Sequence, residues 1–210
     1  MVKDRGRMRL ILVRHGVTQW NQENRAIGHT DIELNEEGRR QAQGLASALK
    51  GERVAAIYSS PLRRALETAQ AIAHFHQGEV KIDGDFIELD AGELDGLTYE
   101  EMRDRYGEFL QEWIRDACSL AMPGGECLED VQHRAWRGVE RILENHPEDA
   151  VVVVSHNFTI LCIICKALGL DLSQFRRLRL NVASISALNF GERGTTLMRF
   201  NDTCHLQAGG

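Results

Sequence analysis

The run of valines at residues 151–154 is the feature that most constrains the fold of this 210-residue chain. β-Branched side chains favour extended backbone, and a short run that is apolar at every position indicates a strand buried on both faces. Helical segments are expected at about 128–145 before this strand and up to residue 168 after it. A buried strand between two helices is typical of a parallel sheet that helices cover on both faces.

The same alternation extends over the rest of the chain. Short apolar segments predict three more strands before the valines and an antiparallel pair after them, at 9–13, 54–58, 80–82, 184–190 and 196–200. Helices are expected at about 36–50, where Asn35 can cap the first turn, and directly after Ser60-Pro61. An exposed amphipathic helix is expected at 99–117.

These elements together predict an α/β fold of three layers, α/β/α. A mainly parallel central sheet should carry helices on both faces, because that is how alternating strands and helices pack. The segment at about 97–126 is the best candidate for a small helical insertion over the sheet edge. No linker, internal repeat or low-complexity tract divides the sequence, so we expect residues 1–210 to form a single domain.

Composition and charge argue against several classes of protein. Hydrophobic residues make up 43% and charged residues 27% of the chain, which is typical of a globular protein and not of a disordered one. The formal net charge of −6, with no concentrated basic segment, argues against nucleic-acid binding. The longest apolar run, at 160–165, is too short to span a bilayer. Neither a nucleic acid nor a membrane is therefore expected as a partner.

The spacing of cysteines and histidines bears on location and on metals. The 5 cysteines show no disulfide-like spacing and no secretory leader is visible, so the chain is expected to be cytoplasmic. The histidines do not form a metal-ligand pattern with nearby carboxylates. We expect a protein that works without a metal and without a bound cofactor.

Polar side chains follow three of the predicted strands, at the point where each strand ends. Arg14-His15-Gly16 follows the first strand, residues 59–63 follow the second, and Ser155-His156-Asn157 follows the valine run. In open parallel sheets, ligands bind at the carboxyl ends of the strands, where such loops converge. Two histidines and two arginines should therefore meet over one crevice.

The chemistry of such a crevice favours a phosphate group. Each guanidinium fork can bind two oxygens of an oxyanion, and a helix that begins behind His156 adds backbone donors. A neutral imidazole such as that of His15 keeps a lone pair on one nitrogen and is a competent nucleophile. Gly16 allows close approach of backbone next to it. The residues therefore predict phosphoryl transfer through His15.

Residues 12–21, with the sequence LVRHGVTQWN, resemble the signature of the histidine phosphatase superfamily, the phosphoglycerate-mutase-like enzymes. Further pieces of the resemblance follow in the same order along the chain: GHTD at 28–31, YSSPLRRA at 58–65, Glu88, PGGE at 123–126 and VSH at 154–156. Each piece alone is weak, but their order and their strand context make the resemblance specific. The family fold is likewise a mainly parallel sheet with helices on both sides.

The resemblance implies a role for each matching residue. His15 matches the nucleophile that becomes phosphohistidine, and Glu88 matches the general acid and base. Arg14, Arg63 and His156 match the residues that grip the phosphoryl oxygens.

Two asparagines complete the expected site. Asn21 matches a polar residue that helps to hold the phosphoryl group, and Asn157 is assigned to the same group because it follows His156 at the helix start. Arg64 is expected to lie on the solvated side of its helix.

Three functions follow from these expectations. The first is a phosphatase, in which water takes the phosphoryl group from His15; the second is a mutase of the phosphoglycerate type; the third is an inactive phosphate-binding regulatory module. The acid lies in IELDAG at 87–92, not in the Glu-Arg-His-Tyr-Gly stretch of the mutases, and the following insertion is short. Both features favour a phosphatase that acts on a small-molecule phosphate monoester. The physiological substrate and the oligomeric state, a homodimer included, stay open.

Overall fold

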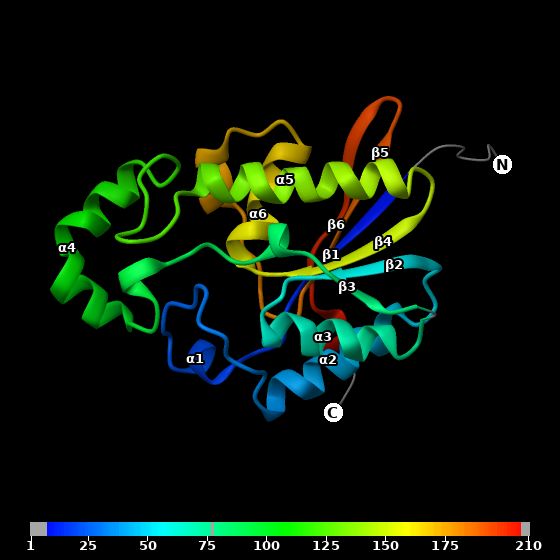
Figure 1. The fold of residues 1–210 in the computed structure, drawn as a ribbon, viewed down its shortest axis with the longest axis horizontal. Coiled ribbons are helices and arrows are strands. Elements are labelled where there is room, and N and C mark those ends of the chain that lie inside the picture. Colours follow the sequence, from blue (N-terminus) through cyan, green and yellow to red (C-terminus); the bar gives the residue numbers. More distant parts are fainter. Residues whose placement is uncertain (1–7, 77, 207–210) are drawn as a thin grey trace.

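The computed structural model describes residues 8–76 and 78–206, and these form a layered α/β fold (Figure 1). Its sheet has 6 strands in the order β3-β2-β4-β1-β5-β6. Their bounds are β1 (Met8–Arg14), β2 (Val54–Ser59), β3 (Val80–Ile82), β4 (Ala150–Ser155), β5 (Ile185–Gly191) and β6 (Gly194–Asp202). β1, β2, β3 and β4 pair in parallel, whereas β5 pairs antiparallel with both β1 and β6. The predicted mainly parallel sheet is confirmed.

The helices lie in two layers, one on each face of the sheet (Figure 1). One face carries α2 (Glu36–Leu49) and α3 (Arg63–Ala73), and the other carries α5 (Leu128–Asn145) and α6 (Asn157–Ala167). The remaining helices are α1 (Gln19–Gln22), α4 (Tyr99–Arg115) and the 3₁₀ segments η1 (Gly84–Phe86), η2 (Gly92–Leu94), η3 (Leu172–Arg177) and η4 (Cys204–Leu206). The three-layer prediction is therefore confirmed.

Alternation along the strands assigns each side chain to one of the two cores. In β1, Leu10 and Leu12 pack toward α5 and α6, while Ile11 and Val13 pack toward α2 and α3. All four side chains are at most 1% exposed, because both faces of a central strand are covered. The valines of β4 alternate in the same way, which explains why the run is apolar at every position.

α4 differs from the other long helices because none of its residues is buried. It extends away from the sheet (green in Figure 1). A capping box starts it, in which Thr98 and Glu101 exchange hydrogen bonds between side chain and backbone. The expected exposed helix is present and ends at Arg115.

The strand ends bring the predicted site together. Arg14, the last residue of β1, is in register with Ser155 at the end of β4, and Ser59 of β2 is in register with Val154. The three loops that follow therefore leave neighbouring strands at one edge of the sheet. Among the described helices, none is both long and apolar enough to cross a membrane.

Candidate active site

His15 lies directly after β1 and is only 3% exposed. Its Nδ1 is 2.7 Å from the carbonyl oxygen of Gly16. Because a carbonyl only accepts, Nδ1 carries the proton and the lone pair lies on Nε2. Burial lowers the pKa of His15 well below its usual value, and the charges of Arg64 and Arg14 lower it further. The ring is therefore neutral at pH 7 and has a free lone pair.

The Gly16 backbone that follows His15 packs against another backbone segment. A Cβ atom added at Gly16 would lie 2.5 Å from the carbonyl oxygen of Gly38, at the start of α2. Only glycine allows this approach, which was expected from the sequence. The contact fixes the loop that carries His15 against the helix layer.

His156 is the second buried histidine of the site. It is the N-cap residue of α6, and its ring centroid lies 5.1 Å from that of His15. Its Nε2 is 2.7 Å from the Ser60 hydroxyl, and its Nδ1 is buried without a partner in the described residues. Burial and then the charge of Arg64 lower the pKa of His156 well below its usual value. The expected meeting of the two imidazoles is confirmed.

Arg14 reaches from β1 toward the start of α6. One of its terminal nitrogens donates to the carbonyl oxygen of Leu180 at 2.7 Å and lies 3.4 Å from the Oδ1 of Asn157. Its Nε is buried and has no partner in the described part of the chain. Burial lowers the pKa of Arg14, and the negative charge of Glu88 opposes that shift.

The structure does not bring Arg63 to the two histidines; the second arginine, whose charge acts on both of them, is Arg64. Arg64 is fully buried, and it donates to the carbonyl oxygens of Gly28 at 2.8 Å and Thr30 at 2.9 Å. Burial lowers its pKa to about 10, so the guanidinium stays charged at neutral pH. Its Nε has no partner among the described residues.

Arg63 instead lies on the solvent side of α3. Its side chain is 55% exposed and pairs with Glu33, and its backbone N–H donates to the Asp31 carboxylate at 2.7 Å. The expectation that Arg64 lies in solvent is therefore also wrong. Arg64, Thr68 and Ile72 are buried and recur at a spacing of four, so they lie on one face of α3. Arg63 does not lie on this face.

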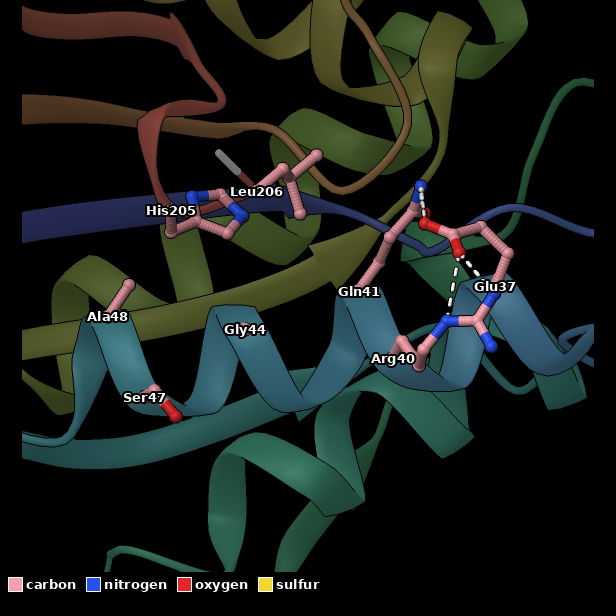
Figure 2. A pocket seen from close by; sticks show the side chains of 8 residues that line it. All are labelled: Glu37, Arg40, Gln41, Gly44, Ser47, Ala48, His205 and Leu206. Carbon is pink, nitrogen blue, oxygen red and sulfur yellow. Dashed lines mark hydrogen bonds and ion pairs between the residues drawn. The ribbon is translucent and has the colours of Figure 1, made fainter. Parts of the chain in front are cut away.

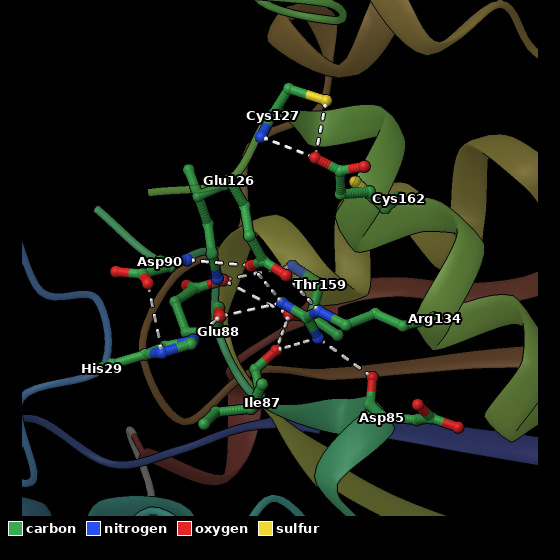
Figure 3. Close-up of polar contacts among 12 residues, drawn as sticks. His29, Asp85, Ile87, Glu88, Asp90, Glu126, Cys127, Arg134, Thr159 and Cys162 are labelled. Carbon is green, nitrogen blue, oxygen red and sulfur yellow. Dashed lines mark hydrogen bonds and ion pairs between the residues drawn. The ribbon is translucent and has the colours of Figure 1, made fainter. Parts of the chain in front are cut away.

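Glu88 is 5% exposed and faces the start of α6 (Figure 3). Its carboxyl oxygens accept from the backbone N–H of Leu89 at 2.9 Å and from those of Phe158 and Thr159 at 3.3 Å. These amides include unpaired donors of the first turn of α6. The side chain thereby lines the same pocket as His15 and Asn157.

The two asparagines line the open part of the site. The Oδ1 of Asn21 accepts from the backbone N–H of Thr18 and lies within hydrogen-bond distance of its hydroxyl, both at 3.0 Å, so its Nδ2 group is what it offers to a ligand. Asn157 is the first residue of α6.

A pocket of about 240 Å³ contains most of the predicted site. It is lined by Arg14, His15, Asn21, Glu88 and Asn157, together with Arg25, Ile27 and Phe158. The last three residues were not found from the sequence. Two of them lie in the long loop after β1, and nothing in their local pattern separates them from solvated loop residues.

A larger pocket of about 580 Å³ lies between α2 and η4 and contains none of the predicted site residues (Figure 2). Glu37 and Arg40 in its lining pair with each other, which neutralises their charges. In the described residues, no group of three or more His, Cys, Asp or Glu side chains is placed to hold a metal ion.

Comparison with known proteins identifies the family. The model of the histidine phosphatase superfamily, branch 1, matches residues 10–203. Phosphoserine phosphatase 1 of Hydrogenobacter thermophilus is 37% identical over 199 residues, which cover 95% of this chain and 94% of that protein. A probable phosphoglycerate mutase of Cronobacter sakazakii is 31% identical over 206 residues, 96% of each chain.

Solved structures give the same result. Mycobacterial glucosyl-3-phosphoglycerate phosphatase in complex with VO3 superposes with a TM-score of 0.86 and is 31% identical, covering 93% of this chain and 99% of that one. Phosphoserine phosphatase of Entamoeba histolytica, a histidine-to-alanine variant in complex with phosphoserine, has a TM-score of 0.84 and 30% identity, covering 95% and 99%. The chain therefore belongs to the histidine phosphatase superfamily and is an enzyme of this metal-independent phosphomonoesterase class.

Proposed function

We propose that this enzyme hydrolyses small phosphate monoesters through a phosphohistidine formed on Nε2 of His15. The observation that carries the proposal is the hydrogen bond from Nδ1 to the Gly16 carbonyl oxygen, at 2.7 Å. That bond fixes the tautomer, and the lowered pKa keeps the ring neutral, so the lone pair is available at neutral pH. No metal is needed to activate such a nucleophile.

The phosphoryl oxygens are held by Arg14, Arg64 and His156. Each of these side chains has a buried nitrogen without a partner among the described residues: Nε in the two arginines and Nδ1 in His156. Buried polar groups in folded proteins are nearly always paired, so these donors are suited to an anion. Charge on the equatorial oxygens of a transferring phosphoryl group is stabilised by such preorganised donors. Asn21 and Asn157 line the pocket together with Arg14 and His15 and complete the binding group, whereas Arg64 and His156 are fully buried and are not among the residues that line it.

Glu88 serves as the general acid and then as the general base. In the first step Nε2 of His15 bonds to phosphorus, the ester P–O bond breaks, and the leaving oxygen takes the proton of the Glu88 carboxyl group. In the second step water attacks phosphorus, Glu88 takes a proton from that water, and the P–N bond breaks. Inorganic phosphate and neutral His15 result.

The leaving-group side of the pocket suggests the substrate to test first. Arg25 lines the pocket, and its guanidinium pairs with the carboxylate of Glu23 at 2.7 Å and lies 3.6 Å from that of Glu101. Because these pairs are partly exposed and therefore weak, a substrate carboxylate can compete for the guanidinium. Similar proteins are named for phosphoserine and for glucosyl-3-phosphoglycerate, which both contain a carboxylate. We therefore propose carboxylate-bearing monoesters such as phosphoserine as substrates.

The decisive test uses phosphoserine and p-nitrophenyl phosphate with the wild type, His15→Ala and the control His133→Ala, whose histidine is exposed on α5. Rapid quenching should trap an acid-labile phosphoenzyme in the wild type and in the control. His15→Ala should form none and lose phosphate release by about 10⁴-fold or more, since a covalent route would be removed. Full activity of His15→Ala would overturn the mechanism.

A mutase remains the second candidate, because one similar protein is named a probable phosphoglycerate mutase. The same quench experiment separates the two reactions. A phosphatase releases phosphate at the steady-state rate of phosphoenzyme turnover, whereas a mutase holds the phosphoenzyme until an acceptor alcohol is added.

A further inference from the structure

Arg134, on α5, contacts the segment that carries Glu88 (Figure 3). Its two terminal nitrogens donate to three backbone carbonyl oxygens: that of Asp85 at 3.1 Å, that of Ile87 at 2.6 Å and that of Glu88 at 2.9 Å. The side chain is 12% exposed, so these bonds are largely shielded from water. One guanidinium thus fixes the backbone up to and including Glu88.

Glu126 holds this guanidinium in place and extends the contact past Glu88. Its Oε1 accepts from Nε of Arg134 at 2.9 Å, and its Oε2 accepts from a terminal nitrogen at 3.0 Å. Oε2 also accepts from the backbone N–H of Asp90 at 3.0 Å. Burial disfavours the charged form of Glu126, but the bonds from Arg134 and Asp90 outweigh it and lower the pKa.

The carbonyl oxygen of Glu88 has a second donor on its other side. Nε2 of His29 lies 2.8 Å from it, and Nδ1 of His29 lies 3.7 Å from the Asp90 carboxylate. Since a carbonyl only accepts, His29 donates through Nε2. Hydrogen bonds from α5 and from the loop after β1 therefore fix the main chain of Glu88. α6 contacts only its side-chain carboxyl group.

We propose that Arg134, braced by Glu126, is a positioning residue that aims the Glu88 carboxyl group at the leaving oxygen. The proposal rests on the role of Glu88 as general acid given above. In the described contacts the two residues touch neither His15 nor the other phosphate-binding side chains, and the charge of Arg134 is only a minor cause of the lowered pKa of His156. They therefore act on the reaction mainly through the position of Glu88. Small errors in the aim of a catalytic group have large effects on rate.

The test compares substrates that differ in how much they need an acid. p-Nitrophenolate leaves without protonation, whereas the alkoxide of phosphoserine does not. Arg134→Lys keeps a charge but loses the fork that binds the carbonyls, and it should lower kcat/KM for phosphoserine, which reports the phosphorylation of His15, by about 10- to 100-fold, part of what a general acid supplies. kcat/KM for p-nitrophenyl phosphate and the affinity for vanadate should change less than about threefold, because the phosphoryl side is intact and Glu88 acts on that substrate only in the later hydrolysis of the phosphoenzyme.

Arg137→Gln is the matched control on the same helix. Arg137 is exposed and pairs with the Asp85 carboxylate instead of with backbone carbonyls, so both substrates should keep wild-type rates. Glu126→Gln is the second, milder variant. It tests the positioning role if thermal unfolding shows that Arg134→Lys is not folded. Glu126→Gln should likewise lower kcat/KM for phosphoserine more than kcat/KM for p-nitrophenyl phosphate.

If a folded variant loses kcat/KM equally for both substrates, the positioning role is overturned. Glu88→Gln tells that failure from failure of the proposed function. If Glu88→Gln loses phosphoserine activity selectively and the Arg134 and Glu126 variants do not, only the positioning role is wrong. If Glu88→Gln itself shows no selectivity, the general acid is wrong and the positioning role falls with it.

Discussion

The two sides of the catalytic pocket are built from different kinds of structure. The phosphoryl side consists of buried side chains at the ends of β1 and β4 and at the start of α3, with His15 at 3% exposure and His156 and Arg64 at 0%. The proposed leaving-group side consists of partly exposed loop residues such as Arg25 and Ile27, which line the pocket. The first side is rigid because the sheet fixes it, whereas the second can vary without disturbing the sheet.

This difference separates chemistry from substrate choice. Changes on the phosphoryl side should affect every substrate, because each one presents the same phosphoryl group. Changes on the leaving-group side should affect substrates unequally, because they touch only the part that differs. The predictions below test this division.

The largest expected effect separates two adjacent arginines. Arg64→Gln should lower kcat/KM by about 10²- to 10³-fold for every monoester, as loss of one preorganised donor does elsewhere. Arg63→Gln should change it less than about twofold, because that side chain is exposed and pairs with Glu33. Steady-state kinetics on phosphoserine and p-nitrophenyl phosphate check both variants. A larger loss of kcat/KM in Arg63→Gln than in Arg64→Gln would mean that Arg63, and not Arg64, binds the phosphoryl group.

Vanadate binding should sharpen the same side of the comparison. An anion that binds only the folded protein stabilises it by about 2.7 kcal/mol at 100 times its dissociation constant. At that fixed vanadate concentration the stabilisation should shrink to near zero in Arg64→Gln and persist in Arg25→Gln. Thermal unfolding with and without vanadate measures it. Equal stabilisation in both variants would mean that Arg64 does not hold the anion.

On the leaving-group side, Arg25→Gln should raise KM for phosphoserine by about tenfold, since one charge-assisted pair with a carboxylate is lost. Ethanolamine phosphate lacks that carboxylate, so its KM should not rise. The ratio of the two KM values is the measurement. A parallel rise for both substrates would assign Arg25 to the phosphoryl side or to the fold.

The smallest expected effect concerns pH. Burial, and then the neighbouring arginines, lower the pKa of His15 well below 6.5, so kcat/KM should fall by less than about twofold between pH 7.5 and 6.5 through this group. His156 shifts in the same direction. Below pH 6.5 the unfolded chain takes up protons that the folded histidines do not, so stability falls as the pH drops. Urea unfolding at pH 8 and pH 5.5 checks the sign, and higher stability at pH 5.5 would contradict it.

The sequence predicts the phosphoryl side well because strand ends are fixed by the hydrophobic pattern. The valines of β4 place Ser155 and His156 at the sheet edge, and the strand before Arg14 does the same for His15. The helical period of α3 also predicts which of Arg63 and Arg64 lies in solvent. At about 100° per residue, Arg63 lies roughly opposite the apolar face of Ala65, Ala69 and Ile72 on α3. This period therefore predicts Arg63 as the exposed arginine of the pair.

The leaving-group side is harder to predict for a physical reason. Arg25, Ile27 and Phe158 reach the pocket through loop conformation and a helix start, and neither has a periodic signature. Arg134 lies in a helix whose buried face includes Val131 and Ala135, and a charged residue beside that face usually points to solvent. Only the fold shows that it reaches the carbonyls around Glu88.

The contact between Gly16 and Gly38 sets a limit on how this enzyme can be altered. A Cβ at Gly38 would lie 2.1 Å from the carbonyl oxygen of Val17, a closer clash than the one of 2.5 Å at Gly16. Randomised libraries at either position should return glycine alone among active clones. The outer face of α4, by contrast, can change in sequence without disturbing the nucleophile, whereas its half-buried side chains Met102, Phe109 and Trp113 pack against the core and are constrained.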